Sequence, residues 1–364
     1  MRCDRSRLLA HFAACAAFAV TAAAQFRNGN QTVVLELPRV SQRAEVVQRI
    51  GLTDIRVLYH RPAVHGRKIW GSVVPYRSVW RTGANEITRI EFSDPVTVEG
   101  HPLPPGAYGL HMIPGESSWT VIFSRDATSW GSFFYDAKDD ALRVDVTPRP
   151  NEMRELLTFD FTDVTPDAAT LTLEWEKLAV PIRFAVDTKT IVLPRIRRQL
   201  TALPQYTSMA WDDAARYLLD EGWNLDEALQ YADRSLGKEE TFQNLLTKAE
   251  ILRKLGRSAE AQAVFGHAIR SAGAAQVHGY ARQLQAQGPE QSEQALEIFT
   301  ENAAAHPDAW IIHAGLARVH SAHHEFARAA EEMQLALAAA PEAQRVGVQK
   351  QLDELRAGRD INGP

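Results

Sequence analysis

The sequence predicts a two-domain α+β protein, in which an N-terminal antiparallel β-sandwich-like domain at about residues 31–187 precedes an α-helical repeat domain at about residues 205–345. In the first part, apolar and polar residues alternate with the period of a strand, and Pro, Gly and Asp interrupt them at short intervals. In the second part, apolar residues follow the period of a helix, and small residues recur about every 34 positions. Residues 188–204 are expected to form a linker, and residues 346–364 the end of the last helix and a tail.

Ten short strands are expected in the β-domain. Turn-forming groups such as Asp94-Pro95 and Pro114-Gly115 separate them, because proline fixes its own φ and glycine accepts conformations that other residues avoid. Many short antiparallel strands with tight connections favour a sandwich or a partly open barrel. The expected strands are Thr32–Leu37, Asp54–Tyr59, Ile87–Phe92, Val96–Glu99, Ala107–Ile113, Trp119–Phe123, Leu142–Val146, Leu156–Phe161, Thr170–Trp175 and Val180–Val186.

Four alanines mark the repeat in the second domain, because Ala228, Ala261, Ala295 and Ala329 lie 33, 34 and 34 positions apart. In the second of these units, Phe265 follows four positions later and a further alanine seven positions later. Small residues at this spacing let two helices approach closely, while the larger residue fills the space between them. The pattern resembles a tetratricopeptide array, and we expect its extended surface to bind a protein or a peptide.

The first 24 residues are expected to be a signal peptide. Three arginines among the first seven residues precede the apolar stretch Leu8–Val20, and the small residues Ala22–Ala24 precede an expected cleavage before Gln25. The mature protein is therefore expected outside the cytoplasm, in the periplasm or secreted. No other stretch approaches about 18 uncharged apolar residues, so the sequence predicts no membrane span.

Both cysteines of the chain, Cys3 and Cys15, lie inside the expected signal peptide. The mature chain is therefore expected to contain no disulfide, no thiol nucleophile and no thiolate metal ligand. Lipidation at Cys15 is the alternative to cleavage after Ala24, and it would anchor the protein to a membrane.

Composition and motifs exclude several classes of function. The formal net charge of −5 argues against nucleic acid as the main partner, because phosphate binding needs a basic surface. The string Gly115-Glu116-Ser117-Ser118 lacks the second glycine of a nucleophile elbow. His320 and His324 are four positions apart but lack a third ligand, so we expect no metal site and no cofactor.

A dense polar and aromatic block between Tyr59 and Glu86 is the candidate ligand site. Arginine binds carboxylate or phosphate through its planar fork, and tryptophan beside arginine and asparagine also suits a sugar ring. The alternative is structural: the aromatic residues close the end of the sandwich and the arginines cap backbone carbonyls. The predicted ligand-binding residues are Arg61, His65, Arg67, Trp80, Arg81 and Asn85.

The same block and the strands after it resemble the bacterial domain-of-unknown-function family 2911 over about residues 40–186. This resemblance implies an exported bacterial β-domain, in some members joined to a helical-repeat tail, and it implies no reaction. The motifs that carry it are Arg61-Pro62, Gly66-Arg67, Trp70-Gly71, Val74-Pro75, Trp80-Arg81, Gly83-Ala84-Asn85, Thr88, Leu103-Pro104, Gly106, Tyr108, Ile113-Pro114, Trp119–Ile122, Trp130-Gly131, Tyr135 and Leu171–Glu176.

The sequence favours an exported, non-enzymatic binding or scaffold protein, because it contains no complete catalytic motif. An extracytoplasmic hydrolase acting on a sugar or peptide-like substrate is the alternative, with His65 or His111 as base and with Arg81 and Asn85 stabilising an oxyanion. A third possibility is a β-domain that binds nothing. Geometry separates these interpretations: a shared pocket favours binding or catalysis, whereas separate carbonyl caps favour a structural role.

Overall fold

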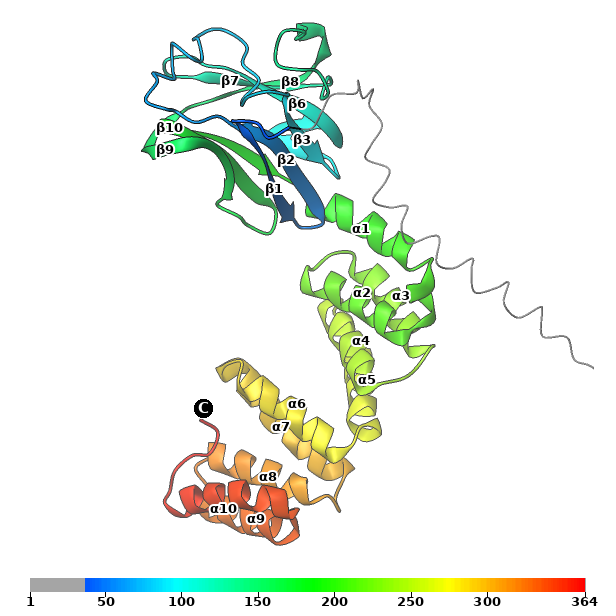
Figure 1. Cartoon of the computed structure of the whole chain (residues 1–364). Helices are drawn as coiled ribbons and strands as arrows, with labels where there is room; N and C mark the ends of the chain where they lie inside the picture. Colours follow the sequence, from blue (N-terminus) through cyan, green and yellow to red (C-terminus); the bar gives the residue numbers. More distant parts are fainter. Residues whose placement is uncertain (1–36, 364) are drawn as a thin grey trace, which may run out of the picture. The chain divides into compact units, whose positions relative to one another are not determined.

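The computed structural model describes residues 37–363, so the expected signal peptide and most of the first expected strand lie outside the described residues. The chain divides into two compact units between Ile191 and Val192. The first unit is built from antiparallel β-sheet and the second from helices, as Figure 1 shows. The predicted α+β class with an N-terminal β-domain and a helical C-terminal part is therefore confirmed.

The β unit contains two antiparallel sheets. The larger sheet has six strands in the order β1-β2-β3-β6-β7-β8, and the smaller has four in the order β5-β4-β10-β9. The strands are β1 (Gln42–Ile50), β2 (Thr53–Arg61), β3 (Thr88–Phe92), β4 (Val96–Val98), β5 (His101–Leu103), β6 (Gly106–Ile113), β7 (Trp119–Ser124), β8 (Asp140–Val146), β9 (Arg149–Thr162) and β10 (Ala168–Ala185).

Alternate residues of both sheets form a single core. Val57 of β2 and Leu110 of β6 contribute from the larger sheet, and Leu173 of β10 contributes from the smaller one; all three are fully buried. One buried face on each sheet, meeting in one core, is the arrangement of a β-sandwich. Trp80 also lies in this core, where its ring stacks on that of Trp175 with centroids 5.9 Å apart.

Several elements of the β unit differ from the prediction, among them the short strand β5, which was not expected, and β9, which begins before the expected strand Leu156–Phe161. Strand β1 was not expected, because only alternate positions such as Ala44 and Val46 face the core, while the exposed positions of this edge strand are mostly charged or polar. Strand β10 is continuous where two strands were expected. A register shift around Glu176, whose φ is 55°, interrupts its pairing with β9 as a bulge, and the strand then continues.

The expected linker at residues 188–204 is largely helical. Helix α1 (Thr188–Gln199) begins where the Asp187 carboxylate accepts a hydrogen bond from the backbone N–H of Thr190 at 3.1 Å. It contains Pro194, which removes one helical hydrogen bond, and its apolar residues are nevertheless buried. A short 3-10 helix, η3 (Leu203–Tyr206), follows.

The helical unit consists of antiparallel hairpins α2/α3, α4/α5, α6/α7 and α8/α9, followed by α10. The four predicted alanines lie on the second helix of each hairpin and are at most 3% exposed. Close helix packing at these positions agrees with the predicted repeat, whereas the tetratricopeptide likeness stays a prediction. The helices are α2 (Ser208–Asp220), α3 (Leu225–Leu236), α4 (Phe242–Lys254), α5 (Ser258–Ser271), α6 (Ala274–Gln285), α7 (Pro289–Ala305), α8 (Trp310–Ala322), α9 (Phe326–Ala339) and α10 (Glu342–Arg356).

Candidate functional site

Three of the predicted ligand residues cap separate backbone carbonyls. Arg61 donates from Nε to the carbonyl oxygen of Leu157 at 2.9 Å. Arg67 donates from Nε to that of Val64 at 3.1 Å. Asn85, which sits at φ 61° instead of in the expected turn beside Arg81, donates from Nδ2 to the carbonyl oxygen of Ser41 at 3.2 Å. These contacts favour a structural role for the three residues, and their ligand role stays a prediction.

Trp80 and His65 also lie apart from each other. Trp80 is 9% exposed, and its Nε1 donates to the carbonyl oxygen of Gly83 at 3.2 Å. His65 is exposed at φ 48°, where its backbone N–H donates to Glu155 Oε1 at 2.8 Å. The ring of Trp80 therefore contributes to the core, and His65 belongs to a surface loop beside β9.

Arg81 differs from the other arginines of this block. Trp80 and Met112 exchange both backbone hydrogen bonds, at 2.8 and 2.9 Å, and both side chains face the core. The next residues in this antiparallel pair, Arg81 and His111, are therefore neighbours on the opposite, outer face of the sheet. His111 in turn pairs with Ile122. A cross-strand row thus begins with the predicted Arg81 and continues through His111.

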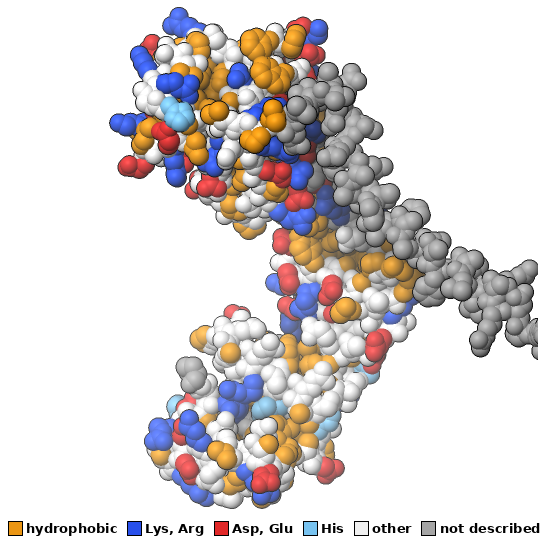
Figure 2. Space-filling view, in the orientation of Figure 1, with side chains coloured by type: hydrophobic (Ala, Val, Ile, Leu, Met, Phe, Trp, Pro, Cys, Tyr) orange, Lys and Arg blue, Asp and Glu red, His pale blue; other side chains and the backbone are white. Residues whose placement is uncertain are grey.

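The connection between β7 and β8, residues 125–139, lies over this outer face. Ser132 Oγ is 3.1 Å from His111 Nδ1, and the ring of Tyr135 contacts the His111 ring with centroids 5.2 Å apart. A Cβ built on Gly131 would lie 3.9 Å from Arg81 Cδ, which places the Arg81 side chain beside the same connection. Figure 2 shows hydrophobic side chains on the surface of this part of the β unit.

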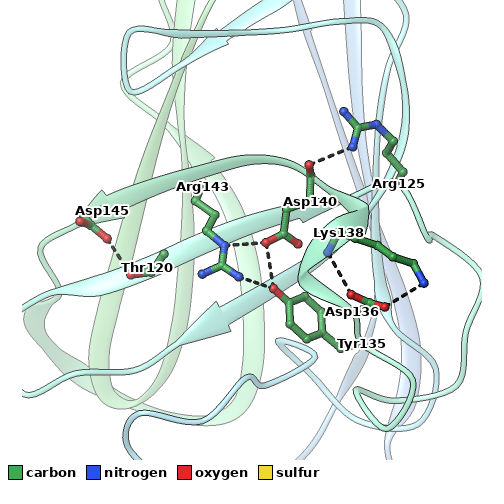
Figure 3. A network of polar contacts seen from close by, with 8 residues as sticks. All are labelled: Thr120, Arg125, Tyr135, Asp136, Lys138, Asp140, Arg143 and Asp145. Atoms are coloured by element: carbon green, nitrogen blue, oxygen red, sulfur yellow. Dashed lines mark hydrogen bonds and ion pairs between the residues drawn. The ribbon is translucent and has the colours of Figure 1, made fainter.

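The far end of the row is a closed polar network, drawn in Figure 3. Ile122 pairs with Arg143 of β8, whose Nε donates to Asp140 Oδ2 at 2.5 Å and whose Nη2 donates to the Tyr135 hydroxyl oxygen at 2.5 Å. The Tyr135 hydroxyl donates to the same Asp140 oxygen at 2.9 Å. Burial, and then the hydrogen bond to Asp140, raise the pKa of Tyr135. Arg143 is therefore neutralised, whereas Arg81 at the other end of the row is not.

The alternative of a hydrolase with His111 as base is weakened by the surroundings of that residue. His111 is 1% exposed. Burial lowers its pKa to about 4, against the opposing effects of Asp140 and Asp126. An imidazole with so low a pKa is a weak base at neutral pH, since a good general base has a pKa near the working pH.

Residues 41–184 match the family model described as protein of unknown function (DUF2911). This match confirms the resemblance for the β-domain, and it covers both the predicted loop and the row of Arg81, His111 and Arg143. No curated protein matches the chain. Over residues 41–184 the β unit is therefore similar to this family, whose description names no reaction.

Outside the DUF2911 region, the helical unit contains a polar groove of about 480 Å³. Helices α2 and α4 contribute Arg216, Gln243, Leu246, Ala249, Glu250 and Arg253, and Phe265 comes from α5. Residues from α6 to α7 complete the groove: Tyr280, Gln283, Leu284, Gln287, Gln291 and Gln294. The floor is apolar, while amides and charged groups form much of the wall.

A second feature of the helical unit is a bound segment of its own chain, Asp360–Asn362. Ile361 is 6% exposed and belongs to the core of α8, α9 and α10. Arg318 of α8 donates from Nη1 to the Ile361 carbonyl oxygen at 2.6 Å, and the Ile361 N–H donates to Ser321 Oγ at 3.1 Å. Gln285 of α6 donates from Nε2 to Asn362 Oδ1 at 2.8 Å. Side chains of α8 therefore bond the backbone of this irregular segment, and α6 bonds the side chain of Asn362.

The sequence did not indicate that Ser132, Tyr135 and Arg143 belong to the same outer face as Arg81, because strand register and the connection after β7 bring them there. The groove glutamines carried no helical signal, because Gln283 lies on α6, Gln287 in the turn after it and Gln291 on α7. In the described part of the chain, no group of three or more His, Cys, Asp or Glu side chains is placed to hold a metal ion. No helix among residues 37–363 is long and apolar enough to cross a membrane.

Proposed function

We propose that this protein is a non-enzymatic binding protein whose helical unit holds an extended peptide segment of a partner. The observation that carries the proposal is the groove between α4 and α6, with its apolar floor and its wall of amide and charged side chains. A glutamine amide both donates and accepts hydrogen bonds, so a row of glutamines matches the alternating N–H and C=O groups of an extended backbone. Apolar pockets between them select side chains of the peptide.

Arg216 supports the proposal from one end of the groove. Its Nη2 donates to Thr247 Oγ1 at 2.7 Å, and its Nη1 lies 4.0 Å from Glu250 Oε2, while its Nε is buried without a hydrogen-bond partner in the described residues. Glu250 is thus beyond hydrogen-bonding distance of Nη1, so this N–H group can donate to a bound carbonyl or carboxylate oxygen.

The segment Asp360–Asn362 supports the choice of a peptide as ligand. It lies against α6 and α8, one repeat further along than the groove between α4 and α6. Arg318 stands at the repeat position that leucine occupies in the other three hairpins, Leu218, Leu252 and Leu284. These four positions are spaced 34, 32 and 34 residues apart. The first helices of two hairpins thus already bind a short non-helical segment of chain, α8 through its backbone and α6 through a side chain.

A random peptide library displayed on phage and panned on the mature chain tests the proposal. Selected peptides are expected to bind the wild type and to bind Gln283→Ala and Arg216→Gln at least about tenfold more weakly, the effect of losing one to two hydrogen bonds. Gln349→Ala is the matched control, because Gln349 donates to Asp353 within α10 and does not line the groove. Selection of no peptide, or equal binding by all variants, contradicts the proposal.

The proposal includes export of the protein, on the basis of the charged and apolar pattern of residues 1–24. N-terminal sequencing of the protein isolated from its native host is expected to begin at Gln25. An acylated Cys15 would instead mean a lipid-anchored protein, and an intact Met1 in the cytoplasm contradicts export.

A further inference from the structure

We infer that the outer face of the six-stranded sheet in the DUF2911 region holds a second, independent site, which binds the carboxylate or phosphate group of a small ring-bearing molecule through Arg81. The site is built from Arg81 and His111 on the sheet and from Ser132 and Phe133 of the connection above them. It shares no residue with the peptide groove of the helical unit, so either proposal stands without the other.

The guanidinium charge of Arg81 is uncompensated in the described residues. Its Nε is buried without a hydrogen-bond partner, and none of the hydrogen bonds or ion pairs among the described residues involves its guanidinium. Burial is the sole cause that lowers the pKa of Arg81, so no neighbouring carboxylate acts on it. Arginines nearby are instead paired, Arg89 with Glu91 at 2.6 Å and Arg143 with Asp140. A partly buried cation without a counter-charge is an anion-binding group.

The connection between β7 and β8 passes close to Arg81 at Gly131. This glycine has φ 70°, and a Cβ built on it would lie 3.0 Å from Phe133 Cδ2 and 3.9 Å from Arg81 Cδ. The Phe133 ring and the Arg81 side chain therefore approach the same point from two sides. Glycine leaves that point free of a side chain, and a positive φ favours glycine there.

Ser132 and His111 supply the neutral polar part of the site. The Ser132 hydroxyl and the His111 Nδ1, 3.1 Å apart, lie next to Gly131 along the chain and next to Arg81 across the strands. A hydroxyl that both donates and accepts can turn its proton toward an oxyanion held by the guanidinium fork. Neither group adds a charge that would offset Arg81.

Exposed aromatic side chains beside Arg81 suit the body of the ligand. Trp130 and Phe133 are stacked, with centroids 6.4 Å apart and planes at 8°, although 53% and 77% of their surfaces are exposed. The neighbouring Phe134 is 74% exposed. Exposed aromatic groups around a charged anchor favour a flat apolar ring carrying an oxyanion. Figure 2 shows hydrophobic side chains on this part of the surface.

Titration calorimetry of the mature full-length chain with benzoate, benzyl alcohol and inorganic phosphate tests the site. Benzoate is expected to bind, phosphate to bind more weakly, and benzyl alcohol, which lacks the charge, not to bind. Arg81→Gln is expected to weaken benzoate at least about tenfold, the loss of a charge-assisted hydrogen bond. Arg77→Gln is the matched control, because Arg77 is an exposed arginine of the same loop. Its binding of benzoate is expected to match the wild type.

Two further measurements test the contributions of the Phe133 ring and the Arg81 guanidinium separately. Phe133→Ser is expected to weaken benzoate while leaving phosphate unchanged, which separates the ring from the anchor. The NMR signal of the Arg81 Nε–H is expected to shift when benzoate is added, and this readout needs no variant that has to fold. No binding of either anion by the wild type, or equal binding by Arg81→Gln, overturns the proposal.

Discussion

Arg318 of α8 and Ile361 are joined by a hydrogen bond of 2.6 Å from the guanidinium Nη1 to the backbone carbonyl oxygen. Arg318 is 4% exposed, and burial lowers its pKa to about 9, with a further lowering by Arg282 against the opposing effect of Asp360. A buried charge of this kind is retained only where it is hydrogen-bonded. The bond therefore links the position of Arg318 in the repeat to the binding of the segment Asp360–Asn362.

Replacement of Arg318 by leucine, the residue at the equivalent positions of the other three units, is expected to release this segment. The variant loses the bond to Ile361 but also the cost of burying a charge, so its stability is expected to change by less than about 2 kcal/mol. Hydrogen exchange of the Ile361 amide is expected to become faster. Arg356→Leu, which removes an exposed arginine of α10, is the control; unchanged protection of Ile361 in Arg318→Leu contradicts the prediction.

The ion pair between α1 and α3 predicts a pH dependence in the helical unit. Glu227 accepts hydrogen bonds from Arg197 Nε and Nη2, both at 2.8 Å, and from the Tyr231 hydroxyl at 2.5 Å. The bond from Arg197 is the largest cause that lowers the pKa of Glu227 to about 2. A lowered carboxyl pKa stabilises the fold above the ordinary value near 4.5 and loses this effect as the pH falls toward 2.

Glu227→Gln is therefore expected to be less stable than the wild type at neutral pH and equally stable near pH 2. Urea denaturation followed by circular dichroism at both pH values measures the difference. Glu354→Gln on α10 serves as control, because it removes a carboxylate elsewhere in the helical unit. A stability gap between Glu227→Gln and the wild type that persists at low pH contradicts the assignment.

Strand register explains why Arg81 could be predicted as a site residue while its neighbours could not. Arg81 stands out in the sequence beside Trp80 and Gly83, because an arginine next to aromatic and turn residues is typical of a binding loop. Its spacing of four from Asn85 suggested a shared turn. Asn85 instead reaches Ser41, and His111 becomes the neighbour of Arg81 through the pairing of Trp80 with Met112. Pairing across about 30 residues cannot be obtained from local pattern.

The helical unit was predictable for the opposite reason. Contacts within one hairpin join residues close in sequence, so the spacing of Ala261, Phe265 and Ala268 already describes a packed face, and all three are buried. The segment Asp360–Asn362 was not predictable, since its contacts with Gln285 span 77 residues and its short polar sequence has no helical or strand period.

The burial of His111 predicts an acid-sensitive β unit. The pKa of His111 is lowered to about 4 by burial, against Asp140 and Asp126, so between about pH 6.5 and 4 the unfolded chain binds a proton that the folded chain does not. Stability is therefore complete above about pH 6.5 and falls by up to about 3 kcal/mol as the pH approaches 4. His111→Leu is expected to flatten this dependence in calorimetric melts. His278→Leu is the control. Burial also lowers the pKa of His278 to about 4, but this residue lies in the helical unit, so its replacement is expected to leave the β unit unchanged.

Replacing Gly131 by alanine has two separate expected effects, one from the left-handed backbone and one from contact with the Phe133 ring. Gly131→Ala places a methyl group 3.0 Å from Phe133 Cδ2 at φ 70°, whereas Gly66→Ala has nearly the same φ of 66° and nothing within 4 Å. Both variants are expected to lose about 1 kcal/mol through the left-handed backbone. Only Gly131→Ala should displace Phe133 and so weaken benzoate binding beside Arg81, since the added methyl occupies the point that the two side chains share. Thermal denaturation measures the common loss and titration calorimetry the specific one. If both variants bind benzoate equally, the connection at Gly131 is not part of the anion site.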